Sequence, residues 1–259
     1  MKEYFVADRI PLVTVLLVLL FTDFLFSAEK SRVKIAIAAN LVPAVAEIKK
    51  IFEADNPGVN LEIISGASGN LTAQIINGAP YDIFASADMD FPWKLKSEGL
   101  TSEGPDVYAE GFMVLFTVKN INIKNGISLV NDGQIKKISI ANPDTAPYGK
   151  AAINVLKKAG LYDGAVKKLV YAGNVSQAAQ YIIIGADIGF VSRSNMFDPS
   201  MLKYKENINW VALPEEIAAP LKQGVVLLKK SGNNQDAVKA YRFILSTKAK
   251  AVFVKYGYR

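Results

Sequence analysis

The sequence predicts an α/β protein with two lobes, and three observations lead to that expectation. Short apolar runs rich in β-branched residues alternate with longer segments whose apolar residues recur every three or four positions. Two such sets follow one another, and no Gly-, Ser- or Pro-rich linker separates them. At 259 residues the chain is long enough for two modest cores. We therefore expect two lobes, each a mostly parallel sheet flanked by helices.

The first set comprises three strands and two helices. Residues 32–39 predict a strand, and residues 41–54 a helix with one apolar face. Residues 60–65 predict a second strand, and residues 70–78 a second helix. Residues 81–87 are almost continuously apolar after the first two positions, as expected of a parallel strand covered on both faces.

The second set has the same alternation and predicts the other lobe. Its expected strands are residues 136–142, 167–173 and 186–192, and its expected helices are residues 148–160 and 175–185. We assign residues 29–112 to the first part of lobe 1, residues 113–213 to lobe 2, and residues 214–259 to a return to lobe 1. Strands that cross between the lobes would join them.

Residues 1–28 are typical of a secretory signal peptide. Lys2 and Arg9 precede a short apolar run, and small residues follow it. The run is shorter than the roughly 20 residues of a membrane-spanning helix. An N-terminal anchor that is not cleaved is the alternative. We expect export to the periplasm as a protein stabilised by packing alone, since the chain contains no cysteine.

The charge balance does not by itself identify a partner. The net charge is +6 at pH 7, but the lysines are spread along amphipathic helical segments, so a solvated surface is the better interpretation and no nucleic acid is expected. The loops that follow the predicted strands are more informative. They are rich in Asn, Ser, Gly and Pro, and they comprise residues 38–40, 66–69, 141–149, 173–176 and 191–195.

These loops favour an anion site made of neutral donors. In open α/β sheets ligands bind beyond the carboxyl ends of the strands, where the following helices begin. Each helix start exposes N–H groups without intrahelical acceptors and the positive end of the helix dipole. The alternative for any single residue is a helix cap, as for Asn40, Asn70 or Ser176. The interpretation as an anion site therefore rests on all of these loops together and not on any single residue.

A serine nucleophile is the competing interpretation of the loop SGASGNL, residues 65–71. A serine nucleophile needs a base, usually histidine, and the chain contains no histidine. The loop also lacks the G-x-S-x-G spacing, because Gly69 directly follows Ser68. A Ser-Lys dyad remains open at Ser31 or Ser200, outside the strand-end loops. The chain is therefore expected not to be an enzyme, with a serine hydrolase as the weaker alternative.

Five stretches resemble the periplasmic molybdate-binding proteins of ABC importers, and the resemblance runs from about Val33 to the C-terminus. They are AANL, SGASGNLTAQIINGAPYDIFASAD, ANPDTAPYGKAA, AGNVSQAA and GADIGFVSRSN. The resemblance implies a type II periplasmic-binding-protein fold, with a ligand cleft between the lobes that closes over molybdate or tungstate. It also implies a membrane ABC permease as partner, a monomer, no cofactor, and no metal except molybdenum in the bound oxyanion.

The resemblance also implies which residues bind the oxyanion. Ser68 would donate through its hydroxyl and its N–H, and Tyr148 and Val175 through their backbone N–H groups. Family members usually have a serine or threonine in the first loop, but here Ala39 precedes Asn40, so Asn40 would donate through its side-chain amide or its backbone.

Ser192 is the last of the expected ligand-binding residues. Many members of the family have a tyrosine at this position, so Ser192 would donate directly or through a water molecule. Because both departures affect residues expected to touch the ligand, a binding protein for sulfate or an organic anion remains the alternative to one for molybdate.

Overall fold

The computed structural model describes Met1 and residues 30–259 of the chain. The expected signal peptide, residues 1–28, lies almost entirely outside the described residues. Within the described part, no helix combines the length and the apolar composition that a membrane span needs.

Lobe 1 is built on a five-stranded sheet with the strand order β2-β1-β3-β10-β4. β1 pairs in parallel with both β2 and β3, whereas β10 pairs antiparallel with β3 and β4. The strands are β1 (Ser31–Ala38), β2 (Val59–Gly66), β3 (Ile83–Ala85), β4 (Thr101–Gly111) and β10 (Leu221–Leu228).

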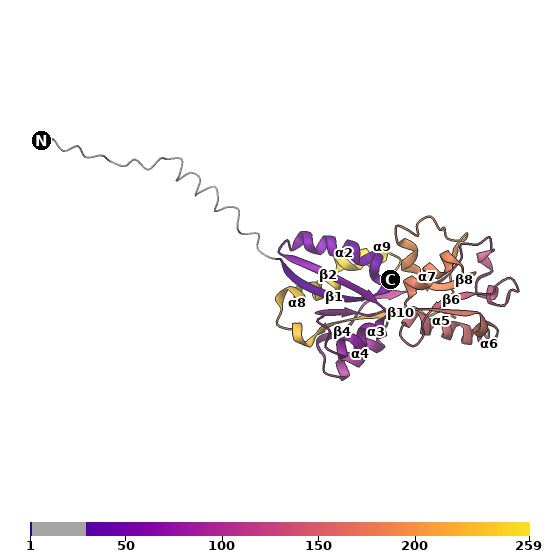
Figure 1. The fold of residues 1–259 in the computed structure, drawn as a ribbon, viewed down its shortest axis with the longest axis horizontal. Helices are drawn as coiled ribbons and strands as arrows, with labels where there is room; N and C mark the ends of the chain where they lie inside the picture. Colours follow the sequence, from indigo (N-terminus) through magenta and orange to yellow (C-terminus); the bar gives the residue numbers. More distant parts are fainter. Residues whose placement is uncertain (2–29) are drawn as a thin grey trace.

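Helices cover both faces of the lobe 1 sheet (Figure 1). They are α2 (Val42–Asp55), preceded by the 3-10 turn η2 (Ala39–Leu41), α3 (Ser68–Ile76), α4 (Asp90–Ser97), α8 (Gln235–Ile244) and α9 (Thr247–Lys255). Phe52 of α2 and Phe253 of α9 belong to the core on one face. Leu71 of α3 and Leu95 of α4 belong to the core on the other face. The sheet is therefore sandwiched between two helical layers.

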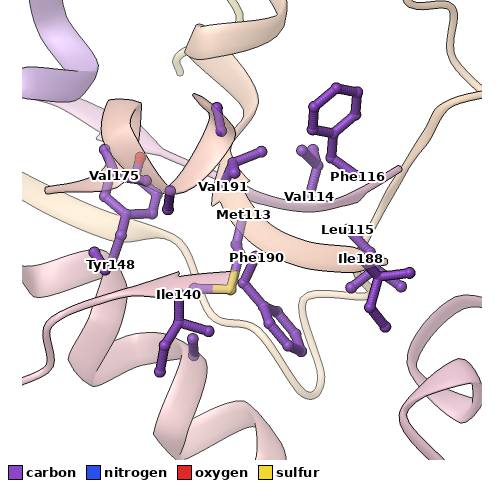
Figure 2. Close-up of a cluster of buried hydrophobic side chains, with 14 of the residues drawn as sticks. Met113, Val114, Leu115, Phe116, Ile140, Tyr148, Val175, Ile188, Phe190 and Val191 are labelled. Atoms are coloured by element: carbon purple, nitrogen blue, oxygen red, sulfur yellow. The ribbon is translucent and has the colours of Figure 1, made fainter. Parts of the chain in front are cut away.

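Lobe 2 repeats this plan with the strand order β7-β6-β8-β5-β9. Its strands are β5 (Met113–Phe116), β6 (Ile138–Ala141), β7 (Leu169–Ala172), β8 (Ile188–Ser192) and β9 (Trp210–Ala212). Its helices are α5 (Pro147–Lys158), α6 (Tyr162–Ala165) and α7 (Val175–Ile184), with the 3-10 segments η3 (Ile123–Asn131), η4 (Val166–Lys168) and η5 (Arg193–Phe197). Figure 2 shows the apolar cluster around Phe116, Ile140 and Phe190.

The two-lobed α/β prediction is confirmed, and each mostly parallel sheet contains one strand, β10 or β5, that runs opposite to the other four. The chain leaves lobe 1 through β4, passes Phe112, and enters lobe 2 as β5. It returns from β9 to β10. We call the region where the chain crosses between the lobes, at β4–β5 and β9–β10, the joint. β5 and β10 each enter a lobe from the joint, so they run opposite to the strands whose carboxyl ends point toward the joint. Both therefore pair antiparallel with their neighbours.

One buried carboxylate joins three strands of lobe 2 at the edge away from the joint. Asp187, just before β8, accepts hydrogen bonds from the backbone N–H groups of Lys136 and Lys137 at 2.7 and 2.8 Å and also contacts the ammonium of Lys119. Burial opposes ionisation of Asp187, yet these hydrogen bonds outweigh it and lower the pKa of its carboxyl.

We expect Asp187→Ala to lower the free energy of unfolding by about 1–3 kcal/mol, because two backbone donors lose their acceptor. A urea titration would measure the loss, with Asp163→Ala, at an exposed position of α6, as the control. Since the folded-state pKa of Asp187 is lowered, its contribution is present above the unfolded value of about 3.9 and declines as the pH falls further. A difference between wild type and variant that stays constant down to pH 2 would contradict this account.

Candidate functional site

A small cavity lies between the two lobes. Lobe 1 contributes residues 38–40, residues 66–68 and Ala87, and lobe 2 contributes residues 146–148 and Val175. These residues lie at or just after the ends of β1, β2 and β3 and at or just before the starts of η2, α3, α5 and α7. Four of the five strand-end loops singled out in the sequence therefore meet at one cavity.

The helix starts supply hydrogen-bond donors to this cavity. Ser68 is the first residue of α3, Tyr148 the second of α5, and Val175 the first of α7. Backbone N–H groups in the first turn of a helix have no intrahelical acceptor. The positive ends of the helix dipoles also converge on the cavity. An anion could therefore be held by groups that carry no full charge.

The side chains that line the cavity, all of them within residues 38–175, are uncharged. Lys150 and Asp90, on opposite lobes, form an exposed ion pair with a distance of 2.9 Å between Nζ and Oδ2. The hydrogen bond to Asp90 raises the pKa of Lys150. The Ser86 hydroxyl donates to Asp88 Oδ1 at 2.9 Å, and burial raises the pKa of the Asp88 carboxyl. Within the described residues, no group of three or more His, Cys, Asp or Glu side chains could hold a metal ion.

Ser68 is placed to donate its hydroxyl proton into the cavity. It is 1% exposed, and its Oγ accepts a hydrogen bond from the Ala87 N–H at 3.1 Å. That bond occupies a lone pair of the hydroxyl and leaves the proton to be donated. Ala87 is a cavity residue that the sequence interpretation missed. The signal that could have found it is its position as the last residue of the third predicted strand, residues 81–87.

Tyr148 and Val175 bring lobe 2 to the cavity, and both also belong to the apolar cluster of that lobe (Figure 2). α5 begins tightly against the end of β6, because a Cβ atom at Gly149 would lie 2.2 Å from the Ala141 carbonyl oxygen. α7 is capped by Asn174, whose side chain accepts from the Gln177 N–H at 3.0 Å. Both helix starts are therefore held firmly, with Tyr148 and Val175 in the lining.

Asn40 lines the cavity, but its side-chain amide has other partners. Its Nδ2 donates to Gln223 Oε1 and to the Tyr258 hydroxyl, both at 2.9 Å. Its Oδ1 is buried and has no hydrogen-bond partner within the described residues. Of the two donor groups considered for Asn40 from the sequence, the backbone N–H is the one that these contacts leave available.

Ser192 is not brought to the lining of the cavity, which takes nothing from residues 191–195 within the described chain. It caps η5: its Oγ donates to Asn195 Oδ1 at 2.6 Å and accepts from the Asn195 N–H at 3.3 Å. Ser192 is fully buried. A direct bond from its hydroxyl to a ligand in this cavity would require these contacts to rearrange.

Hydrogen bonds across the cleft hold the lobes together. The Gly69 N–H of lobe 1 donates to the Thr145 carbonyl of lobe 2 at 2.8 Å. In the other direction, the Ser176 hydroxyl donates to the Ala39 carbonyl at 3.1 Å, and the Ser194 hydroxyl to the Asn40 carbonyl at 2.9 Å. The structure therefore represents a closed form.

Known proteins resemble this chain along most of its length. A family model described as bacterial extracellular solute-binding protein matches residues 33–259. The chain is 35% identical over 234 residues to the molybdate-binding protein ModA of Azotobacter vinelandii, covering 90% of this chain and 91% of that protein. It is 36% identical over 235 residues to the molybdate-binding protein ModA of Rhodobacter capsulatus, covering 89% of each.

The fold agrees as well. The structure of the periplasmic molybdate-binding protein of Azotobacter vinelandii superposes with a TM-score of 0.79 and 31% identity, covering 88% of this chain and 98% of that one. The resemblance noted in the sequence is therefore confirmed. The chain belongs to the bacterial extracellular solute-binding protein family.

Proposed function

We propose that this protein binds molybdate, and also tungstate, in the cavity between its lobes and delivers it to a membrane ABC importer. The observation that carries the proposal is the convergence of four helix starts on a small cavity with uncharged lining residues. The molybdate-binding relatives support the choice of ligand.

The donors of the site suit a fully deprotonated dianion. The backbone N–H groups of Asn40, Ser68, Tyr148 and Val175, together with the Ser68 hydroxyl, would each donate to an oxyanion oxygen. A protonated phosphate would bring a hydrogen that needs an acceptor, and no carboxylate is present among the lining residues within 38–175. An unmatched buried polar group costs about 1–3 kcal/mol, and more if it is charged.

Size is the expected basis for rejecting sulfate. Sulfate is also a tetrahedral dianion, but it is smaller than molybdate, so donors fixed for the larger ion would lie too far from its oxygens. Molybdate and tungstate have nearly the same size, and both should therefore bind. Sulfate or an organic anion remains the alternative ligand. Hydrolysis has less support, because the chain contains no histidine and the relatives are solute-binding proteins.

We also propose how the protein is exported, captures its ligand and is recognised by the permease. Residues 1–28 would direct export to the periplasm, where the remaining chain would act as a monomer. The ligand would first bind to one open lobe, and rotation about the crossing strands β4–β5 and β9–β10 would then bring the other lobe onto it. The closed form would be the shape that the permease recognises.

Calorimetry of the purified mature chain tests the ligand assignment. We expect saturable binding of molybdate and tungstate, and at least 100-fold weaker binding of sulfate and phosphate, which corresponds to about 2.7 kcal/mol. Tight binding of sulfate with none of molybdate would favour the alternative ligand. Turnover of an ester substrate that Ser68→Ala abolishes would favour the hydrolase.

Ser68→Ala should weaken molybdate binding by about 5- to 150-fold, since a loss of 1–3 kcal/mol is expected when a buried anion oxygen loses its donor. Ser139→Ala is a matched control. Ser139 is also a fully buried serine, but its hydroxyl donates to the Ala178 carbonyl at 2.9 Å, away from the cavity lining. The control should lower the melting temperature without changing the affinity. Equal affinities of Ser68→Ala and wild type would exclude Ser68 from the site.

Gly69→Ala tests closure. A Cβ atom at Gly69 would lie 2.9 Å from both the Thr145 carbonyl oxygen and the Phe91 ring, so the lobes could not approach as closely as they do. We expect weaker molybdate binding and a smaller ligand-induced rise in melting temperature. Gly58→Ala, where nothing lies within 4 Å of the new methyl group, should bind normally. Unchanged affinity in Gly69→Ala would argue against ligand binding in this closed form.

A further inference from the structure

Gln223 occupies a buried position in the joint between the lobes. It is the third residue of β10, the strand on which the chain returns to lobe 1, and it is 0% exposed. It is not part of the cavity lining within the described chain. A fully buried glutamine requires hydrogen-bond partners for its amide, and those partners indicate its role.

The amide of Gln223 connects three elements. Its Oε1 accepts from Asn40 Nδ2 at 2.9 Å and lies 2.8 Å from the Tyr108 hydroxyl. Its Nε2 donates to the Tyr148 hydroxyl at 3.3 Å. These partners belong to η2, to β4 and to α5 of the opposite lobe. One side chain thus bridges both lobes.

Two of these partners are cavity residues from opposite lobes. Asn40 and Tyr148 both line the cavity, and the side chain of each is hydrogen-bonded to Gln223. We propose that Gln223 is a positioning residue for the oxyanion, which fixes the closed separation of the helix starts at Asn40 and Tyr148 by bonding to both side chains. This inference rests on the proposed function, since it concerns the same cavity.

Gly111 provides independent support for this role. It is the last residue of β4, one residue before the chain crosses to lobe 2. A Cβ atom at Gly111 would lie 2.1 Å from Gln223 Nε2 and 2.3 Å from the Tyr148 hydroxyl oxygen. The bond between Gln223 and Tyr148 therefore occupies the space that any larger residue at the crossing would fill.

The donors of this cluster keep their protons. Burial raises the pKa of the Tyr108 and Tyr148 hydroxyls well above the usual value. The Tyr258 hydroxyl, also buried, donates to the Asn40 carbonyl at 2.8 Å. The Tyr108 and Tyr148 hydroxyls are therefore neutral at pH 7, which suits a fixed spacer better than a switch.

The bridge predicts a particular kinetic effect. The bond between Gln223 and Tyr148 joins opposite lobes, so it stabilises the closed form and has little effect on capture by an open lobe. Its loss should raise the dissociation rate of molybdate and leave the association rate unchanged. Tyr148→Phe removes the hydroxyl alone and keeps the backbone N–H at the cavity. Gln223→Met removes the amide and keeps a side chain of similar length.

Stopped-flow and equilibrium binding of molybdate to wild type, Tyr148→Phe, Gln223→Met and the double variant test the inference. We expect each single variant to release molybdate about tenfold faster. The double variant should release it no faster than Gln223→Met, because Gln223→Met already removes the bond to Tyr148 together with those to Asn40 and Tyr108. Tyr81→Phe and Gln74→Met are matched controls, since Tyr81 donates to Gln74 at 2.7 Å in an exposed pair on lobe 1. Both should bind as wild type does.

Three results would overturn the inference. One is an unchanged release rate in Tyr148→Phe, a mild substitution that should fold even if Gln223→Met does not. A second is additive effects in the double variant. A third is a lowered melting temperature of the unliganded variants without a change in release rate, which would show a purely structural role. Absence of molybdate binding in the wild type would overturn the proposed function as well, so the two failures are distinguishable.

Discussion

The convergence of four helix starts on one uncharged cavity is the constraint on which the rest of the structure depends. When an oxyanion is buried, each oxygen that loses its contact with water needs a hydrogen-bond donor from the protein. Full positive charges are not needed, because free N–H groups and helix dipoles supply partial charges in a poorly solvated space. Such donors act only where the backbone places them. Two helix starts lie on each lobe, so they meet only in the closed form.

The mixed sheets follow from this requirement. The parallel strands β1 and β2 in lobe 1, and β6 and β7 in lobe 2, end at the cleft, and the helix starts that follow them, η2, α3, α5 and α7, line the cavity. A strand that enters a lobe from the joint must run the other way, as β10 and β5 do. The crossing strands thus bring their own buried side chains, Tyr108 and Gln223, directly behind the cavity.

Much of this was predictable from the sequence, because strand-end loops and helix starts are local patterns. The loops containing Asn40, Ser68, Tyr148 and Val175 were expected to meet, and they do line one cavity. β4 was not predicted: its sequence TSEGPDVYAEG has no regular alternation of apolar and polar residues, and only pairing with β10 makes it a strand. The partners of the Asn40 amide were also unpredictable, because they lie more than 180 residues away in sequence.

The hydrogen bonds of the Asn40 amide limit which groups of the first loop can distinguish one anion from another. With Ala39 in place of a hydroxyl residue and the Asn40 side chain bonded to Gln223 and Tyr258, the first loop offers the cavity only backbone donors. The hydroxyls among the lining residues of the described chain are then those of Ser68 and Tyr148, and the latter is bonded to Gln223. Backbone donors cannot be adjusted by exchanging a side chain. Their distances to an anion change only when whole helices move, so the positioning role that we propose for Gln223 would also limit the size of ion that fits.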